Sequence, residues 1–107
     1  MAESDHDLEF QAPESFEWND RKAELNFAKH DISFDDASGK FYGRLVVRRS
    51  DRNDEERWLA IGFSEERLIA VAFTRRGDVI RIISARRARK NEERDYRNAQ
   101  MERSAQG

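Results

Sequence analysis

Four short apolar runs, separated by only a few polar residues each, occupy the middle of this 107-residue chain. They lie at residues 44–49, 57–63, 68–74 and 79–84. Their Val, Ile, Leu and aromatic content predicts β-strands. A polar loop at 50–55 and turns at 64–67 and 75–78 join them, and Gly77 can adopt a positive φ in the last turn. Links this short favour antiparallel pairing, so the sequence predicts a four-stranded antiparallel meander.

Helical patterns precede the strand region. Apolar residues recur at helical spacing over 21–30, and Asn19 with Asp20 can cap this segment. Ser33 and Asp36 have the spacing of a capping box and predict a second, short helix. Its inner face would carry the apolar residues Phe34, Ala37 and Phe41. Ahead of both helices, residues 16–18 alternate apolar and polar, which indicates a short strand or an extended anchor.

A third helix is expected after the last strand, with Asn91 as its N-cap and acidic residues in its first turn. We expect it to end near Met101. The predicted fold class is therefore α+β, with two N-terminal helices, a four-stranded antiparallel sheet and a C-terminal helix. Residues 14–101 would form a single domain, flanked by a flexible acidic tail at 1–13 and a frayed tail at 102–107.

The charge of the chain is distributed unevenly along its length. Residues 1–20 contain seven acids and no Lys or Arg, whereas residues 75–107 contain ten bases and five acids. Arg accounts for 16 of the 20 bases and can bind phosphate or carboxylate through two parallel hydrogen bonds. The basic C-terminal third thus indicates a polyanionic or acidic partner. Alternatively, these are solvated charges that reflect a GC-rich codon bias.

Several classes of protein are disfavoured. The chain has no Cys, which rules out disulfides and thiolate metal sites. It has no apolar run near the roughly 20 residues that span a bilayer, and no signal-peptide pattern. We therefore expect a soluble, cytoplasmic protein with no membrane partner. Metal-ligand spacing for zinc, a phosphate-binding glycine loop and a nucleophile elbow are all missing, so no metal or other cofactor is expected.

Several blocks of residues, taken together in their order and spacing, resemble the BrnT family of toxins from type II toxin–antitoxin systems. The blocks are Phe16-Glu17-Trp18 with Lys22, Asn26, Lys29-His30, Ile32-Ser33-Phe34 and Ala37; Glu56-Arg57 with Ile61-Gly62; Thr74-Arg75-Arg76-Gly77-Asp78 with Arg81-Ile82-Ile83-Ser84-Ala85-Arg86; and Glu92-Glu93-Arg94 with Tyr96. They cover about three quarters of the chain. Two departures lie at helix ends: Asp31 stands where the family usually has Gly, and Asn19-Asp20 where it often has Asp-Pro.

The resemblance implies a RelE-like fold, ribonuclease activity that inhibits translation, and a cognate antitoxin. In such families the antitoxin is commonly a ribbon–helix–helix protein, here BrnA-like. Two toxins would bind two antitoxins, and operator DNA would be contacted only through the antitoxin. Two other functions remain open. The chain could be a non-catalytic binding module that acts as a corepressor with a DNA-binding antitoxin, or a scaffold whose basic face docks an acidic protein.

Metal-independent cleavage of RNA uses the 2′-hydroxyl of the substrate as nucleophile, and the enzyme must stabilise negative charge and move protons. Arg81 is the first catalytic candidate because it interrupts an Ile- and Val-rich strand; alternatively, that strand is half-exposed. Arg86 and Arg87 follow at the strand's end, where they could clamp a phosphate, Arg86 in catalysis and Arg87 in substrate binding. They could equally pair with Glu92 or Glu93. Arg57 could reach the same side, or pair with Glu55 or Asp54.

Two more catalytic candidates and one binding candidate come from helices. Lys29 and His30 end the first helix, and His30 could act as general base. Positive charge at a helix C-terminus is also a common capping arrangement. Tyr96, on the last helix, could bind substrate by stacking on a base, or could simply pack on the sheet.

Overall fold

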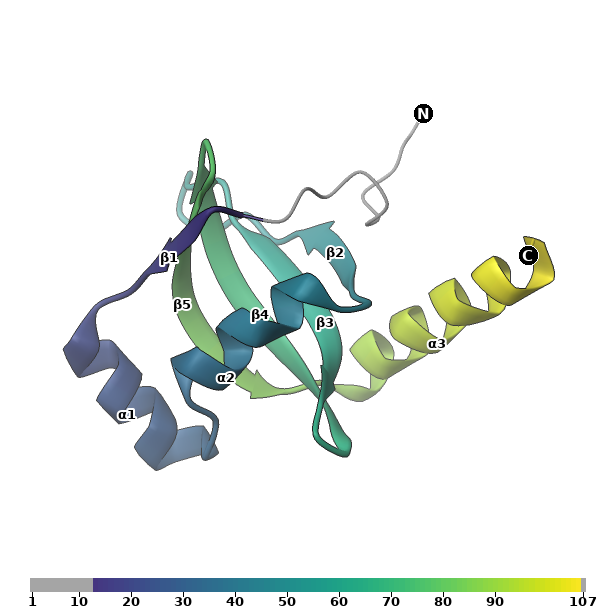
Figure 1. Ribbon diagram of the computed structural model, residues 1–107, viewed down its shortest axis with the longest axis horizontal. Coiled ribbons are helices and arrows are strands. Elements are labelled where there is room, and N and C mark those ends of the chain that lie inside the picture. The colour runs from purple at the N-terminus through teal and green to yellow at the C-terminus, as the bar shows by residue number, and fades with distance from the viewer. Residues whose placement is uncertain (1–12, 107) are drawn as a thin grey trace.

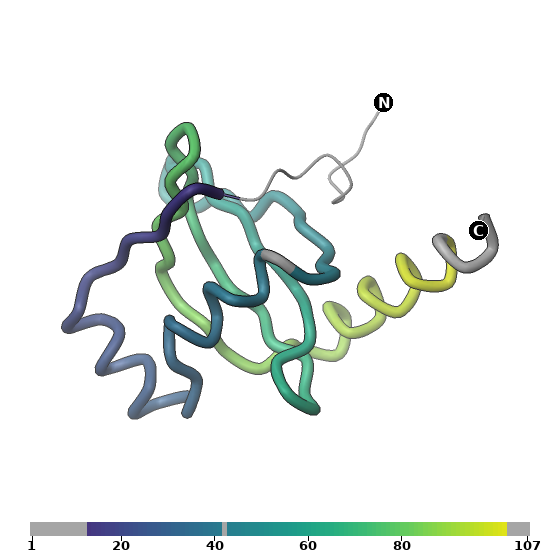
Figure 2. The backbone as a smooth tube through the Cα atoms, in the orientation of Figure 1, coloured from purple at the N-terminus to yellow at the C-terminus, as the bar shows by residue number. Residues whose placement is uncertain are grey.

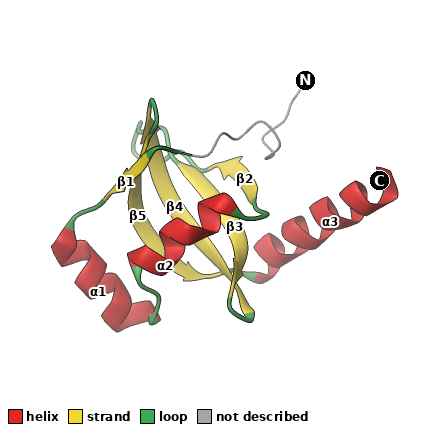
Figure 3. Ribbon diagram, in the orientation of Figure 1, coloured by secondary structure: helices red, strands yellow, loops and turns green. Residues whose placement is uncertain are grey.

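A five-stranded mixed sheet forms the centre of the protein (Figure 1). The structure, a computed structural model, describes residues 13–106. Its elements are, in chain order, β1 (Ser15–Glu17), α1 (Asp20–His30), α2 (Phe34–Gly39), the 3-10 helix η2 (Lys40–Tyr42), β2 (Val46–Arg49), β3 (Trp58–Ser64), β4 (Arg67–Arg76), β5 (Val79–Arg87) and α3 (Lys90–Gln106). The α+β class and the order of helices and central strands agree with the prediction. Figure 3 shows that short loops join most of these elements.

The prediction of a purely antiparallel four-stranded sheet is wrong in one respect. Strands β2 to β5 form the expected antiparallel meander, but β1 adds a fifth strand beside β5 and runs parallel to it. Its register pairs Phe16 with Ile80 and Glu17 with Arg81. A three-residue strand carries too little periodicity to reveal its pairing, because its partner lies more than 60 residues away along the chain.

The two N-terminal helices begin where the capping residues predict. The side chain of Asn19 accepts a hydrogen bond from the Lys22 amide, and that of Ser33 accepts one from Asp36. After α1, Asp31 adopts the left-handed conformation, with φ of 61° and ψ of 33°. Its amide donates to the carbonyl of Phe27, which closes the helix end. Asp occupies this conformation more readily than most residues.

Helix α3 departs from its predicted bounds at both ends. It starts at Lys90, ahead of the predicted cap at Asn91, because the carboxylate of Glu92 accepts a hydrogen bond from the Arg89 amide. It runs to Gln106, beyond the predicted end at Met101, and residues 102–106 include no Gly or Pro that would stop it. Figure 2 shows the first turns beside the sheet and the following turns, as far as residue 102, projecting away from it.

The sheet separates two apolar clusters. Helices α1 and α2 cover one face, hereafter the helical face, where Phe34, Ala37 and Phe41 contact strand residues such as Val71 and Phe73. Phe41 meets Phe73 edge to face at 4.9 Å. The opposite face, hereafter the α3 face, has a smaller cluster of Val46, Leu59, Ile61, Leu68, Ala70 and Tyr96. Because α3 contacts mainly β2 and β3, it leaves much of β4 and β5 uncovered on this face.

The predicted flexible tail at 1–13 lies outside the described residues except for Pro13, which is buried. The next residue, Glu14, already donates a hydrogen bond to Asp78 in the β4–β5 turn. Of the helices between residues 13 and 106, none has the length and apolar character needed to cross a membrane.

Candidate functional site

Four arginines from three strand segments lie on the α3 face. Arg81 pairs with Thr74 across β4 and β5, and with Glu17 across β1 and β5. Arg57 immediately precedes Trp58, which pairs with Phe73 of β4. The backbone of Arg57 still belongs to the sheet, because its carbonyl accepts a hydrogen bond from the amide of Ser50, the residue after β2. Continuing this register places Arg57 beside Thr74. Adjacent strands are about 4.8 Å apart, so the backbones of Arg57 and Arg81 are separated by about 10 Å.

Arg48 and Arg86 lie further along the same face. Arg48 pairs with Leu59, and Arg86 pairs with Ala70, both of which belong to the α3-face cluster. We call this surface the arginine face: Arg48, Arg57, Arg81 and Arg86, with the half-buried Ala72, Thr74 and Ser84 between them. Sequence reasoning missed Arg48. The signal was weak, because Arg48 follows Val46 and Val47 at the end of its strand and is followed by Arg49, so it does not interrupt an apolar run as Arg81 does.

Glu92, at the start of α3, connects two of these arginines. Its side chain is 3% exposed, and its two oxygens accept hydrogen bonds of 2.9 Å from the two terminal nitrogens of Arg86. The guanidinium of Arg48 lies 3.8 Å from Glu92 and also binds Asp95. The ion pair between Arg86 and Glu92, which was the alternative considered from the sequence, is therefore present. It positions Arg86 at the edge of the open surface.

The ionisation of Glu92 reflects these contacts. Burial alone would raise the pKa of its carboxyl, but hydrogen bonds from Arg86 and the Arg89 amide, together with the charge of Arg48, lower the pKa below its ordinary value. The pKa of Arg86 is raised because its hydrogen bonds to Glu92 favour the charged form. Both groups thus remain charged at neutral pH.

The other two arginines have weaker partners. Arg81 contacts Glu17 at 3.2 Å, and both side chains are nearly half exposed. Arg57 donates to Glu55 at 2.8 Å, which is one of the pairings considered from sequence. Exposed pairs of this kind contribute little to stability. Arg57 and Arg81 can therefore exchange their partners for an anionic ligand at low cost.

Lys29 and His30 are not brought to the arginine face. Helix α1 packs on the opposite face, where Asn26 exchanges hydrogen bonds with the backbone of Ala85. Lys29 is exposed and His30 half-buried in the last turn of α1. The carbonyl of the following residue, Asp31, accepts a hydrogen bond of 3.0 Å from Arg67 at the start of β4. The end of α1 thus lies beside the strand end that leads to Arg87.

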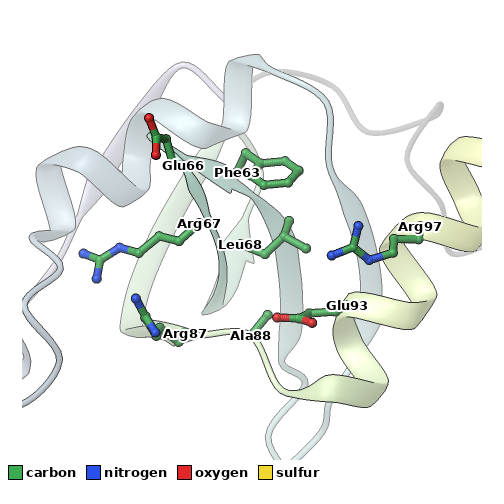
Figure 4. Close-up of a pocket in the computed structure, with 8 residues that line it drawn as sticks. All are labelled: Phe63, Glu66, Arg67, Leu68, Arg87, Ala88, Glu93 and Arg97. Carbon is green, nitrogen blue, oxygen red and sulfur yellow. The ribbon is translucent and has the colours of Figure 1, made fainter.

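Arg87 and Tyr96 lie near one another but have different environments. Tyr96 is 7% exposed and packs on the α3-face cluster, so it cannot offer a ring face for stacking in this conformation. Arg87 is exposed and lines a cavity of about 270 Å³ at the end of the sheet (Figure 4). We call this cavity the end cleft. Its lining residues are Phe63, Glu66, Arg67, Leu68, Arg87, Ala88, Glu93 and Arg97.

No cluster of three or more His, Cys, Asp or Glu side chains suited to holding a metal ion occurs in the part of the chain that the structure describes. The chemistry that the arginine face itself offers comes from its guanidinium groups. Four guanidiniums on one open surface can bind phosphate groups and stabilise negative charge that develops during a reaction.

Comparison with known proteins identifies a family and a similar solved structure. The model of a family described as the ribonuclease toxin BrnT of type II toxin–antitoxin systems matches residues 18–92. Among solved structures, the crystal structure of the Brucella abortus ribonuclease toxin BrnT is similar, with 31% sequence identity and a TM-score of 0.60. The match covers 71% of this chain and 97% of that chain. A search among curated proteins gives no match. The segment matched by the family model contains all four residues of the arginine face.

Proposed function

Because this chain belongs to the BrnT family of ribonuclease toxins of type II toxin–antitoxin systems, we propose that it is a metal-independent endoribonuclease whose site is the arginine face. Arg57, Arg81 and Arg86 are the proposed catalytic arginines, and Arg48 joins them. One observation carries the proposal: four arginines from three strand segments share an uncovered surface on the side of the sheet opposite α1 and α2.

In the proposed reaction, the 2′-oxygen of RNA attacks the adjacent phosphorus while the bond from phosphorus to the 5′-oxygen breaks. The 2′-hydroxyl gives up its proton and the leaving 5′-oxygen gains one, so the products are a 2′,3′-cyclic phosphate and a 5′-hydroxyl. The phosphate acquires extra negative charge at the transition state. The backbones of Arg57 and Arg81 are about 10 Å apart across β4. Their side chains would bind oxygens of the reacting phosphate or of two consecutive phosphates and stabilise this charge.

The four arginines have different proposed roles. Arg81 and Arg57 are held only by exposed carboxylates, so they would move to the substrate. Arg86 is fixed by two hydrogen bonds to the buried Glu92, so it would supply a preorganised charge that needs no rearrangement. Lys29 and His30 remain candidates for proton transfer only if the substrate extends around the end of β5, since α1 lies on the helical face.

The proposal includes a partner. A type II antitoxin is expected to neutralise the toxin, and a BrnA-like ribbon–helix–helix protein would bind it with two copies of each chain. The antitoxin would contribute acidic or apolar side chains to the arginine face, so that operator DNA is bound only by the antitoxin. Cleavage of RNA in the cytoplasm would then inhibit translation whenever the antitoxin is lost.

A comparison of three purified proteins tests the proposal: the wild type, the double variant Arg57→Gln/Arg81→Gln, and the control Arg21→Gln/Lys22→Gln. The control removes two exposed charges from the first turn of α1, on the helical face. Each protein is incubated with RNA in the presence of a chelator, and circular dichroism checks folding. The proposal expects cleavage by wild type and control, 2′,3′-cyclic phosphate ends, and at least about a hundredfold slower cleavage by the double variant.

Other outcomes point elsewhere. Equal cleavage by all three proteins would leave the ribonuclease activity standing but remove its site from the arginine face. Cleavage that stops when the chelator is added would reject metal independence. Absence of cleavage by wild type, together with tighter operator binding of the antitoxin when this chain is added, would favour the corepressor function.

A further inference from the structure

The end cleft combines an exposed aromatic ring with three arginines, and the arginine face does not account for it. We propose that the end cleft binds a single nucleotide of the RNA substrate, with the base stacked on Phe63. The backbone phosphates that flank this nucleotide would be held by Arg97 on one side of Leu68 and by Arg87 and Arg67 on the other (Figure 4). This inference rests on the proposed function for the identity of the substrate. The volume of about 270 Å³ is close to the lower end of the range for small-ligand pockets, about 300 Å³, which limits the occupant to one small group such as a nucleotide.

Phe63 supplies the surface for the base. It lies near the end of β3 on the α3 face, and 46% of the residue is exposed. The ring packs edge to face with Tyr96 at 5.6 Å, which limits its rotation. Figure 4 shows Phe63 at one side of the cleft, with Leu68 and Ala88 forming its apolar base. A nucleobase that covers Phe63 would remove this apolar surface from water and gain stacking energy.

The arginines supply the charge for the phosphate. Within the described part of the chain, the guanidiniums of Arg87 and Arg97 have no hydrogen bond or ion pair, and Arg67 uses one nitrogen for the carbonyl of Asp31. Glu66 and Glu93 also line the cleft, so three positive and two negative side chains leave one net positive charge. One phosphodiester group carries one negative charge. The cleft is therefore matched to one nucleotide.

The end cleft lies at the border of the proposed site. Arg86 and Arg87 are consecutive residues at the end of β5, so their side chains project from opposite faces of the sheet, Arg86 from the arginine face and Arg87 toward the cleft. Glu92 binds Arg86 at the start of α3, whereas Glu93 and Arg97 lie on the cleft side of the same helix. An RNA strand bound on the arginine face can therefore continue around the first turn of α3 into the cleft, one helix diameter of about 10 Å away.

The experiment measures binding of an RNA analogue that cannot be cleaved. The probe is a six-nucleotide single-stranded oligonucleotide with fluorine in place of every 2′-hydroxyl, and fluorescence anisotropy gives its Kd. The variants are Phe63→Leu, which keeps an apolar side chain but removes the ring, and Arg87→Gln and Arg97→Gln, which each remove a charge. Matched controls are Phe27→Leu, an equally exposed Phe on α1, and Arg21→Gln, an exposed Arg on the same helix.

The proposal expects Phe63→Leu to raise the Kd at least fivefold, an effect at the lower end of base–aromatic stacking at about 25 °C. An oligonucleotide with an abasic position at the bound nucleotide should abolish the difference between Phe63→Leu and wild type. Arg87→Gln and Arg97→Gln should weaken binding and lower the slope of log K against log salt by about 0.7 each. The two control variants should bind as wild type does.

Three outcomes would overturn the proposal. In the first, all cleft variants bind the oligonucleotide within twofold of wild type. In the second, the arginine variants bind weakly but Phe63→Leu does not, which would indicate a phosphate contact without a base. In the third, oligonucleotide binding is unchanged while antitoxin binding is lost, which would assign the cleft to a protein partner. Because the probe cannot be cut, binding is measured whether or not the chain cleaves RNA, so failure here is distinct from failure of the ribonuclease proposal.

Discussion

The carboxylate of Glu92 and the guanidinium of Arg86 are joined by two hydrogen bonds of 2.9 Å each, and the Glu92 side chain is 3% exposed. This pair joins the end of β5 to the start of α3 and lies at the boundary between the arginine face and the end cleft. Removal of Arg86 leaves the buried carboxylate of Glu92 without its main partner, which is more costly than loss of the pair as a whole.

Replacement of Arg86 by Ala should therefore lower the free energy of unfolding by about 2–3 kcal/mol, since a charged hydrogen-bond partner is lost and Arg48 compensates only in part. Urea denaturation measures this. The double variant Arg86→Met/Glu92→Leu should be more stable than Arg86→Ala because it leaves no unpaired buried charge. A double variant less stable than Arg86→Ala would contradict this interpretation of the pair.

The stability of the protein should depend on the protonation of Glu92. Its pKa is lowered in the folded state relative to its ordinary value of 4.5, so the folded protein binds this proton less readily than the unfolded chain. The contribution to stability is complete above pH 4.5 and is lost as the pH falls through the folded pKa. Urea midpoints of wild type and Glu92→Gln, measured between pH 7 and pH 3, should therefore converge on acidification. A constant difference across this range would show that the charge of Glu92 is not responsible.

Arg81→Gln should separate stability from activity. The ion pair with Glu17 is nearly half exposed, so its loss should change the free energy of unfolding by less than about 1 kcal/mol. The rate of RNA cleavage should fall about a hundredfold if Arg81 stabilises charge in the transition state. Thermal unfolding and initial cleavage rates measure the two effects, with Arg21→Gln as control. A fall in rate that is fully explained by unfolding would remove Arg81 from the proposed site.

The position directly after α1, occupied by Asp31, should tolerate Gly better than Ala. Asp31 has a φ of 61°, which costs a residue with a Cβ roughly 1 kcal/mol or more unless its side chain compensates. Asp31→Ala should therefore destabilise the protein by about 1 kcal/mol, whereas Asp31→Gly should be within a few tenths of wild type. Thermal unfolding of the three proteins measures the order. If Ala proves as stable as Gly, the left-handed conformation at this position is not what limits the choice of residue.

Local patterns in the sequence were sufficient for most elements because the forces that form them act over a few residues. The side chains of Asn19 and Ser33 accept hydrogen bonds from amides three residues away. Alternation of apolar and polar residues within a central strand indicates which side chains of that strand are buried. The candidate site was predictable in part for the same reason. Arg57 and Arg81 do share one face. Arg81 and Arg86 are five residues apart, so strict alternation would place them on opposite faces, and the register shift between Ala72 and Phe73 brings Arg86 to the same face as Arg81.

Tertiary structure decided the relationships between distant residues. The parallel pairing of β1 with β5 joins Glu17 to Arg81, and the path of α3 brings Glu92 to Arg48 and Arg86. Helix α1 packs on the other face of the sheet, which separates His30 from the arginines. The end cleft forms where the ends of β3, β4 and β5 meet α3. The amino-acid sequence by itself determined the order of the elements and the caps of α1 and α2. Which charges meet depends on how the sheet orders its strands and on which face each helix packs, and no local periodicity encodes those contacts.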